Sequence, residues 1–181
     1  REETELLVET ASAVLDLCSG TGAVALALAD RFPESDVRAV EWMEPALGYL
    51  NRNIARSGLP NVRAVRLDVL DPESARPFRK LDCIVSNPPY VRTDELPGLQ
   101  REVLREPREA LDGGADGLGF YRAIAAHWVP SLRNGGALCA EVGEGQAEEV
   151  ARIFAGAGME RLRFFRDFNR IERVVSGLKP E

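Results

Sequence analysis

Short apolar runs alternate with segments of helical periodicity along most of this 181-residue chain. The apolar runs predict strands at 13–17, 37–40, 62–67, 81–86 and 136–142. The periodic segments predict helices at 22–31, 45–57, 119–129 and 146–155. Strands that alternate with helices form parallel β-α-β units. The sequence therefore predicts a single α/β domain with an open sheet and helices on both faces.

Three further segments depart from this alternation. The runs 161–165 and 170–176 lie so close together that only a hairpin can join them, which adds an antiparallel strand. The stretch 90–119 has weak periodicity and several Gly and Pro residues, and a long irregular stretch inside a compact domain is usually functional. Residues 1–11 have helical spacing and are expected to pack on the sheet edge.

Charge and cysteine usage narrow the classes of function. The net charge of −6 argues against a nonspecific nucleic-acid binder, and no apolar run is long enough to span a membrane. Cys18, Cys83 and Cys139 lack the paired spacing of zinc ligands, so we interpret them as small buried side chains in a reducing compartment, with no metal. The single histidine, His127, lies in an amphipathic helix and is expected to be structural.

A glycine-containing loop follows the first predicted strand directly and is followed at once by a helix. Ligands of such sheets bind at the carboxyl ends of the strands, and glycines let the backbone approach them closely. The spacing Gly20-x-Gly22-x-x-Ala25 also fits a dinucleotide fingerprint, and Glu41 is placed to bind ribose hydroxyls, so NAD is one alternative. The predicted cofactor-binding loop comprises Cys18, Ser19, Gly20, Thr21 and Gly22.

Asp16 distinguishes between the cofactors. A carboxylate at this strand end would repel the pyrophosphate of NAD. It suits S-adenosylmethionine, which carries an ammonium and a sulfonium, together with a ribose for Glu41. A turn-capping role for Asp16 is the plainer alternative, as is a simple strand-end charge for Glu41.

Three other residues are candidates for contacts with the adenine of the cofactor. Asp68 follows the third strand and can accept from the adenine amino group, with Val69 against the ring. A turn residue before Pro72 is an equally good interpretation of Asp68. Trp42 can cover the adenine face, although a core aromatic is the stronger expectation for it.

The sequence Asn87-Pro88-Pro89-Tyr90 ends the fourth strand abruptly. Prolines donate no hydrogen bond, so the Asn87 side-chain oxygen and the Pro88 carbonyl form a corner of acceptors. Such a corner fits a planar amino group, either an amide or a nucleobase amine, and would aim its lone pair at a methyl donor while Tyr90 stacks on it. The alternative is a Pro-rich turn with a satisfied Asn. We predict Asn87, Pro88, Pro89 and Tyr90 as the catalytic segment, with Asn87 also touching the cofactor.

At these motifs the chain resembles the S-adenosylmethionine-dependent amino-methyltransferases. More specific stretches, at 1–5, 106–111, 116–122, 141–143 and 166–175, resemble the HemK/PrmC protein-glutamine methyltransferases. Because these stretches are spread from one end to the other, the resemblance extends over nearly the whole chain. The resemblance implies the class I Rossmann-like sheet of seven strands, with the last antiparallel. It also implies that the loop 18–22, Glu41, Asp68, Val69 and Asn87 hold S-adenosylmethionine, and that 87–90 hold the target glutamine amide.

The resemblance further implies the substrate, which is the glutamine of the Gly-Gly-Gln motif in peptide chain release factors. A cytoplasmic, monomeric catalytic domain over 1–181 is expected, with 1–12 as a linker or edge helix and the family's helical N-terminal domain missing. Cys18 stands where the family usually has Gly, so an unusual backbone angle is expected there. Glu41 replaces the usual Asp, and Glu2 the usual Pro.

Two other functions remain as alternatives at this point. The first is a nucleic-acid amino-methyltransferase, against which stands the acidic net charge. The arginines at 101, 105 and 108 alternate with glutamates, a pattern that indicates a solvent-exposed surface of mixed charge and not a basic patch. The second is a non-enzymatic module that binds S-adenosylmethionine or a nucleotide, which the intact acceptor corner disfavours.

Overall fold

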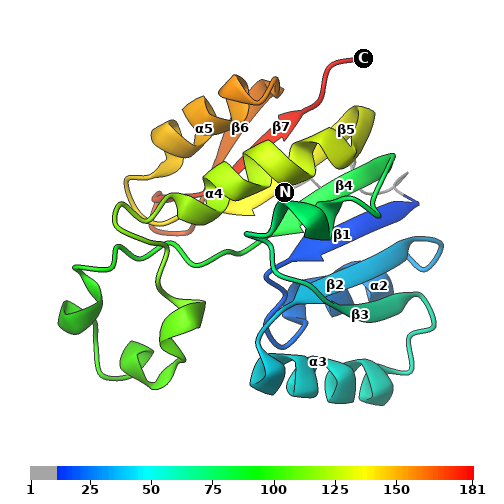
Figure 1. The fold of residues 1–181 in the computed structure, drawn as a ribbon, viewed down its shortest axis with the longest axis horizontal. Coiled ribbons are helices and arrows are strands. Elements are labelled where there is room, and N and C mark those ends of the chain that lie inside the picture. The colour runs from blue at the N-terminus through cyan, green and yellow to red at the C-terminus, as the bar shows by residue number, and fades with distance from the viewer. Residues whose placement is uncertain (1–11) are drawn as a thin grey trace.

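The computed structural model describes residues 12–181 and contains one seven-stranded sheet of order β3-β2-β1-β4-β5-β7-β6. β1 to β5 are parallel, whereas β7 runs antiparallel to both β5 and β6 (Figure 1). The strands are β1 (Ala13–Leu17), β2 (Asp36–Glu41), β3 (Val62–Arg66), β4 (Leu81–Ser86), β5 (Leu132–Glu141), β6 (Glu160–Arg166) and β7 (Glu172–Leu178). The predicted open sheet with an antiparallel last strand is confirmed.

Four α-helices of the described chain cover the sheet. They are α2 (Ala23–Arg31), α3 (Glu44–Ser57), α4 (Gly119–Ala123) and α5 (Ala147–Gly156). Pro45 lies in the first turn of α3, and Gly58 ends that helix with a φ of +68°, as the sequence predicts. The predicted helix 119–129 is α-helical only in α4 and continues as a π-helix, η5 (Ile124–Trp128), and a 3₁₀ turn, η6 (Val129–Ser131).

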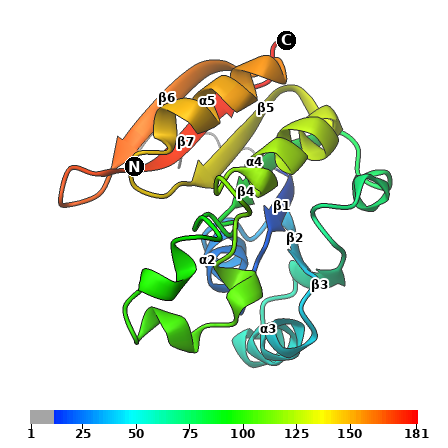
Figure 2. The ribbon, with the colours of Figure 1, turned by 60° about the vertical axis from the view of Figure 1, so that its left-hand side comes forward.

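Two hydrophobic layers, one on each face of the sheet, hold these elements together. Strand side chains alternate between them: Val14 packs in the layer that contains α2 and α3, and Leu15 in the layer that contains α4 and α5. The largest side chains of the second layer, Tyr121, Trp128 and Phe154, are fully buried. Burial of such a side chain contributes roughly 1.5–3 kcal/mol. Figure 2 shows α4 and α5 on one face of the sheet and α2 on the other.

The irregular segment between β4 and α4 projects from the sheet in both views (Figures 1 and 2). It carries three short 3₁₀ turns, η2 (Leu96–Gly98), η3 (Val103–Arg105) and η4 (Arg108–Ala110); a fourth, η1 (Pro72–Ala75), precedes β4. Its two ends are joined by the Val91 amide, which donates to the Leu111 carbonyl at 2.9 Å, and the Gly113 amide, which donates to Val91 at 2.8 Å. The predicted irregularity of 90–119 is thus confirmed.

Two remaining expectations concern cysteines and the chain start. Cys83 and Cys139 are buried free thiols, as expected, whereas the free thiol Cys18, in the loop after β1, is only half-buried. The predicted helical segment at 1–11 lies outside the described residues. Over residues 12–181, the structure contains no helix with the length and apolar character needed to cross a membrane.

Candidate functional site

The carboxyl ends of β3, β2, β1 and β4 meet along one rim of the sheet. Leu17 at the end of β1 pairs with Val40 of β2 and with Ser86 of β4. Glu41 pairs with Arg66, the last residue of β3. This rim is where the strand order reverses direction around β1, the usual ligand site of an open α/β sheet. The predicted site residues that follow each strand are therefore brought together in space.

The loop after β1 turns through three left-handed residues: Cys18 at φ +58°, Gly20 at +55° and Gly22 at +90°. A Cβ on Gly20 would meet no atom within 4 Å, so this backbone borders open space that a ligand can approach. At Gly22 the positive φ favours glycine, and a Cβ there would lie 2.4 Å from Leu50 Cδ1, so that the leucine side chain would have to move. The unusual backbone angle expected at Cys18 is observed, and this positive φ is unfavourable for any residue other than glycine.

Glu41 holds this loop against the end of β2. One of its carboxylate oxygens accepts from the Gly20 amide at 2.8 Å. The other accepts from the amides of Trp42 at 2.9 Å and Met43 at 2.7 Å. The Ser19 amide adds a bond of 2.9 Å to the Val40 carbonyl. The Glu41 carboxylate is therefore fixed on the rim beside the glycine loop, with its side chain 8% exposed in all.

Asp16 is a buried carboxylate beneath the same loop, only 1% exposed. Its Oδ2 accepts from the Ala25 amide in the first turn of α2 at 3.1 Å and so ties the start of that helix to β1. Burial, helped by the nearby charge of Glu41, raises the pKa of Asp16 to about 7, although hydrogen bonds with Ser19 and Ala25 act in the opposite direction. No cation pairs with it within residues 12–181. A positively charged ligand on the rim would stabilise its ionised form.

The three candidates for an adenine contact differ in exposure. Asp68 Oδ1 accepts from the Leu70 amide at 2.9 Å, so its role in a turn is observed. Val69 is only 4% exposed, and its carbonyl accepts from Trp128 Nε1 at 2.9 Å. Trp42 is 54% exposed. The expectation of a core aromatic at Trp42 is wrong, because Trp42 lies one residue past the end of β2, on the rim rather than inside a layer.

The acceptor corner follows the end of β4, and its two acceptor oxygens are free to bind a ligand. Asn87 is exposed, Pro88 and Pro89 are buried, and Tyr90 is half-buried. Within the described part of the chain, no donor reaches the Asn87 side-chain oxygen or the Pro88 carbonyl. The interpretation of a turn with a satisfied Asn is therefore not what the structure shows. Burial raises the pKa of the Tyr90 hydroxyl, so this ring stays neutral and suited to stacking.

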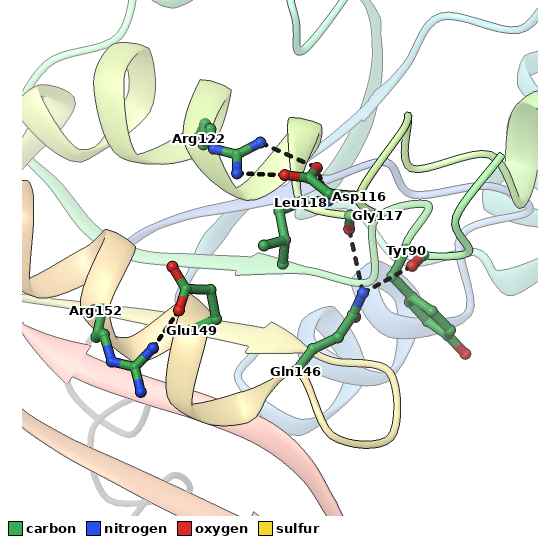
Figure 3. Close-up of polar contacts among 8 residues, drawn as sticks. All are labelled: Tyr90, Asp116, Gly117, Leu118, Arg122, Gln146, Glu149 and Arg152. Atoms are coloured by element: carbon green, nitrogen blue, oxygen red, sulfur yellow. Dashed lines mark hydrogen bonds and ion pairs between the residues drawn. The ribbon is translucent and has the colours of Figure 1, made fainter. Parts of the chain in front are cut away.

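Gln146, which our sequence interpretation did not single out, holds the corner in place (Figure 3). Its Oε1 accepts from the Gly143 amide at 3.0 Å, and its Nε2 donates to the carbonyls of Tyr90 at 3.0 Å and Gly117 at 3.4 Å. A Cβ on Gly117 would lie 2.4 Å from the Tyr90 oxygen. The sequence shows only a polar residue shortly after the strand end 141–143, which does not reveal the contacts with Tyr90 and Gly117.

An ion pair steadies the segment that leads from the corner into α4. Arg122 binds both carboxylate oxygens of Asp116, at 3.1 and 2.5 Å, and the Leu118 amide donates to Asp116 at 3.1 Å (Figure 3). These hydrogen bonds lower the pKa of Asp116 to about 2. Gly117 therefore meets Gln146 from a chain segment that is itself fixed.

Comparison with known proteins agrees with this geometry. Residues 3–117 match the family model "Methyltransferase small domain". A release factor glutamine methyltransferase of Thermodesulfovibrio yellowstonii is 38% identical, over 97% of this chain and 66% of its own length. The enzyme of that name from Geobacter sulfurreducens is 41% identical, over 98% of this chain and 64% of its own. The chain thus spans just under two thirds of these relatives, and the family resemblance of the sequence is confirmed.

Solved structures show the same fold at low sequence identity. A methyltransferase of Pyrococcus furiosus superposes with a TM-score of 0.68 at 17% identity, over 99% of this chain and 83% of that one. An O-methyltransferase family protein of Burkholderia thailandensis gives 0.68 at 16% identity, over 97% and 53%. The class I methyltransferase fold predicted from the sequence is confirmed. Fold, rim and sequence agree: the chain belongs to the methyltransferase small domain family.

Proposed function

We propose that this domain transfers a methyl group from S-adenosylmethionine to the side-chain amide nitrogen of the glutamine in the Gly-Gly-Gln motif of peptide chain release factors. The observation that carries the proposal is the pair of acceptors at Asn87 and Pro88, which have no donor among residues 12–181. They lie on the same rim as the glycine loop. The names of the curated relatives support the substrate, since they are called release factor glutamine methyltransferases.

The rim has the chemistry that S-adenosylmethionine requires. Bound there, it would supply an electrophilic methyl group and a positive charge. Asp16 would balance that charge, and the open backbone at Gly20 leaves room for the ligand. Glu41 would bind the ribose hydroxyls, with Asp68, Val69 and Trp42 around the adenine. Cys18, Ser19, Thr21 and Gly22 would shape the loop that holds it.

The acceptor corner would grip the two hydrogens of the target amide. Asn87 Oδ1 takes one and the Pro88 carbonyl takes the other, which orients the nitrogen lone pair toward the methyl donor. Both dipoles also stabilise the positive charge that grows on nitrogen during transfer. Pro88 and Pro89 fix the positions of the acceptors, because their φ angles are locked. Tyr90 would stack on the planar amide.

The surface charge of the proposed substrate protein is complementary to that of this chain. A release factor binds RNA and carries basic surface, whereas this chain has a net charge of −6. The proposed setting is the cytoplasm, where release factors act, and the proposed active form is a monomer that binds no nucleic acid directly. We also propose that residues 1–181 form the catalytic unit.

Methyl label tests the proposal directly. The protein is incubated with labelled S-adenosylmethionine and a saturating amount of release factor, DNA or RNA, and the products are mapped by mass spectrometry. We expect label on the glutamine of the Gly-Gly-Gln motif and none on a release factor whose glutamine is replaced. Label on nucleic acid alone would overturn the proposal in favour of a nucleobase amino-methyltransferase.

A further inference from the structure

Glu141 lies directly beside the acceptor corner. Ala140 of β5 pairs in parallel with Ser86 of β4, so the next residues, Glu141 and Asn87, follow in neighbouring strands about 4.8 Å apart. Val85 and Cys139 pack in the layer on the α2 side of the sheet. Because side chains alternate along a strand, Glu141, the last residue of β5, is directed to that same side, next to the point where Asn87 follows β4.

The Glu141 carboxylate is half-buried and has no hydrogen bond or ion pair among residues 12–181. Burial raises its pKa, and the charge of Arg173 on β7 opposes that effect. Glu141 in turn raises the pKa of the Tyr90 and Tyr121 hydroxyls, so the carboxylate lies within electrostatic reach of the corner. Tyr121, from α4, donates to the Glu141 main-chain carbonyl at 2.9 Å, which fixes the strand end.

Methylation of an amide nitrogen releases one proton. The oxygens of Asn87 and Pro88 are neutral carbonyls, so they accept hydrogen bonds but are poor bases. Asp16 is 1% exposed and bonded to the Ala25 amide, and both oxygens of Glu41 are bonded to backbone amides. Two carboxylates within electrostatic reach of Tyr90, Glu141 and Glu106, are unpartnered in the described chain and in contact with solvent. Of these two, Glu141 is the one that ends the strand paired with β4, next to the point where Asn87 follows that strand.

We propose that Glu141 is a further catalytic residue, which accepts the proton that the target amide nitrogen loses as it gains the methyl group; this inference rests on the proposed function. The nitrogen lone pair forms the new N–C bond, and sulfur keeps the electrons of the broken S–C bond. The electrons of the broken N–H bond stay on nitrogen. As the methyl group is added, one of the two N–H groups exchanges its hydrogen bond with the corner for one with a Glu141 oxygen, which takes the proton and passes it to solvent.

The test compares Glu141→Gln with Glu144→Gln, an exposed glutamate three residues away with no assigned role. Single-turnover transfer to a Gly-Gly-Gln peptide is measured at saturating cofactor and peptide over a range of pH. We expect Glu141→Gln to slow transfer on the order of 10²-fold, the usual effect of a general base, and Glu144→Gln to leave it unchanged. Glu141→Asp should recover part of the rate.

Two further readouts separate proton transfer from binding. The wild-type rate should fall as pH drops through the pKa of Glu141, and Glu141→Gln should lose this acidic limb. Calorimetry with S-adenosylhomocysteine and the peptide should give equal affinities for both proteins. A wild-type protein that transfers to glutamine while Glu141→Gln does so equally fast would overturn the role of Glu141 alone. A wild-type protein that labels only nucleic acid would overturn both this role and the proposed function.

Discussion

The side-chain amide of Gln146 donates a hydrogen bond to the main-chain carbonyl of Tyr90, 3.0 Å away, and so joins the start of α5 to the acceptor corner. The same side chain accepts from Gly143 and donates to Gly117. One residue thus holds three loops that come from distant parts of the sequence. Because Gln146 bonds to the Tyr90 carbonyl and not to Asn87, it acts on the corner through the Tyr90 backbone.

Replacement of Gln146 by Ala should loosen the corner without removing a reacting group. We expect a stability loss of about 1–3 kcal/mol, because up to three partners lose their hydrogen bonds. Transfer to glutamine should slow, whereas cofactor affinity should stay constant. Gln100→Ala, at an exposed loop position, is the control for denaturant unfolding and single-turnover assays. Equal kinetics for the two variants would show that Gln146 does not position the corner.

Asn87→Ala removes one of the two acceptors for the target amide. The Pro88 carbonyl remains, so substrate can still enter, but its nitrogen is no longer aimed. We expect the transfer step to slow on the order of 10²–10³-fold with folding preserved, as for loss of one preorganised polar group. Wild-type rates at saturating substrate would rule out the acceptor mechanism.

Asn87→Asp is the subtler change at the same position. It keeps the acceptor geometry but adds negative charge on the rim, where the sulfonium is proposed to bind. We expect tight cofactor binding with poor transfer, measured by calorimetry and single-turnover labelling in parallel. Efficient transfer by Asn87→Asp would show that acceptor geometry alone is sufficient.

The raised pKa of Asp16 couples stability to pH in a defined direction. Its ordinary value is 3.8 and its value in the folded protein is about 7, so the folded state holds a proton that the unfolded state has lost between these limits. Stability from this group is complete below pH 4 and is lost as pH rises through 7, by up to about 4 kcal/mol. Denaturant unfolding from pH 5 to pH 8 should show that the free energy of unfolding of Asp16→Asn rises relative to that of the wild type. The control Asp30→Asn, on the exposed face of α2, should follow the wild type at every pH.

Binding of S-adenosylmethionine should follow the opposite trend. A cationic ligand favours ionised Asp16, so wild-type affinity should rise with pH through about 7. Asp16→Asn should lose this dependence and about 1–3 kcal/mol of affinity at pH 8. Isothermal calorimetry at several pH values measures both. Affinity that is unchanged by the substitution would limit Asp16 to capping α2.

Gly20 and Gly58 provide a matched pair for the glycine loop. Both have positive φ, +55° and +68°, and at both a Cβ would meet no atom within 4 Å. Each Ala substitution should therefore cost about 1 kcal/mol of stability through the backbone alone. Only Gly20 borders the proposed cofactor, so Gly20→Ala should also weaken S-adenosylmethionine binding about tenfold or more. Equal affinities for the two variants would place the ligand elsewhere.

The strands could be predicted because each is a short apolar run with a polar or glycine residue at its end. β1 and β4 have the predicted bounds. β5 begins at Leu132, four residues before the predicted start at 136, because its first part, Arg133 to Gly135, is polar and glycine-containing and carries no apolar signal. The register shift between Leu81 and Cys83 opposite this part shows that its pairing is irregular.

The site was predictable where it depends on strand ends and less so where it depends on loops. Asp16, Glu41 and Asn87 could be placed on one rim because parallel strands end on one edge. Gln146 could not, because its contacts join residues 29 and 56 positions apart in the sequence. Trp42 was expected in the core from its size, but its side chain follows a strand end and is exposed.

The strand order also separates the two proposed substrates along the chain. The segment from β1 to β3 and the turn after it carry Asp16, Glu41 and Asp68, whereas everything proposed to touch the acceptor amide comes after β4 begins. The two halves meet along a single seam, where β1 lies beside β4. Mutations beyond that seam can therefore change which molecule is methylated while the donor half is inherited intact. A fold divided in this way lets new methyl acceptors evolve without rebuilding the donor half.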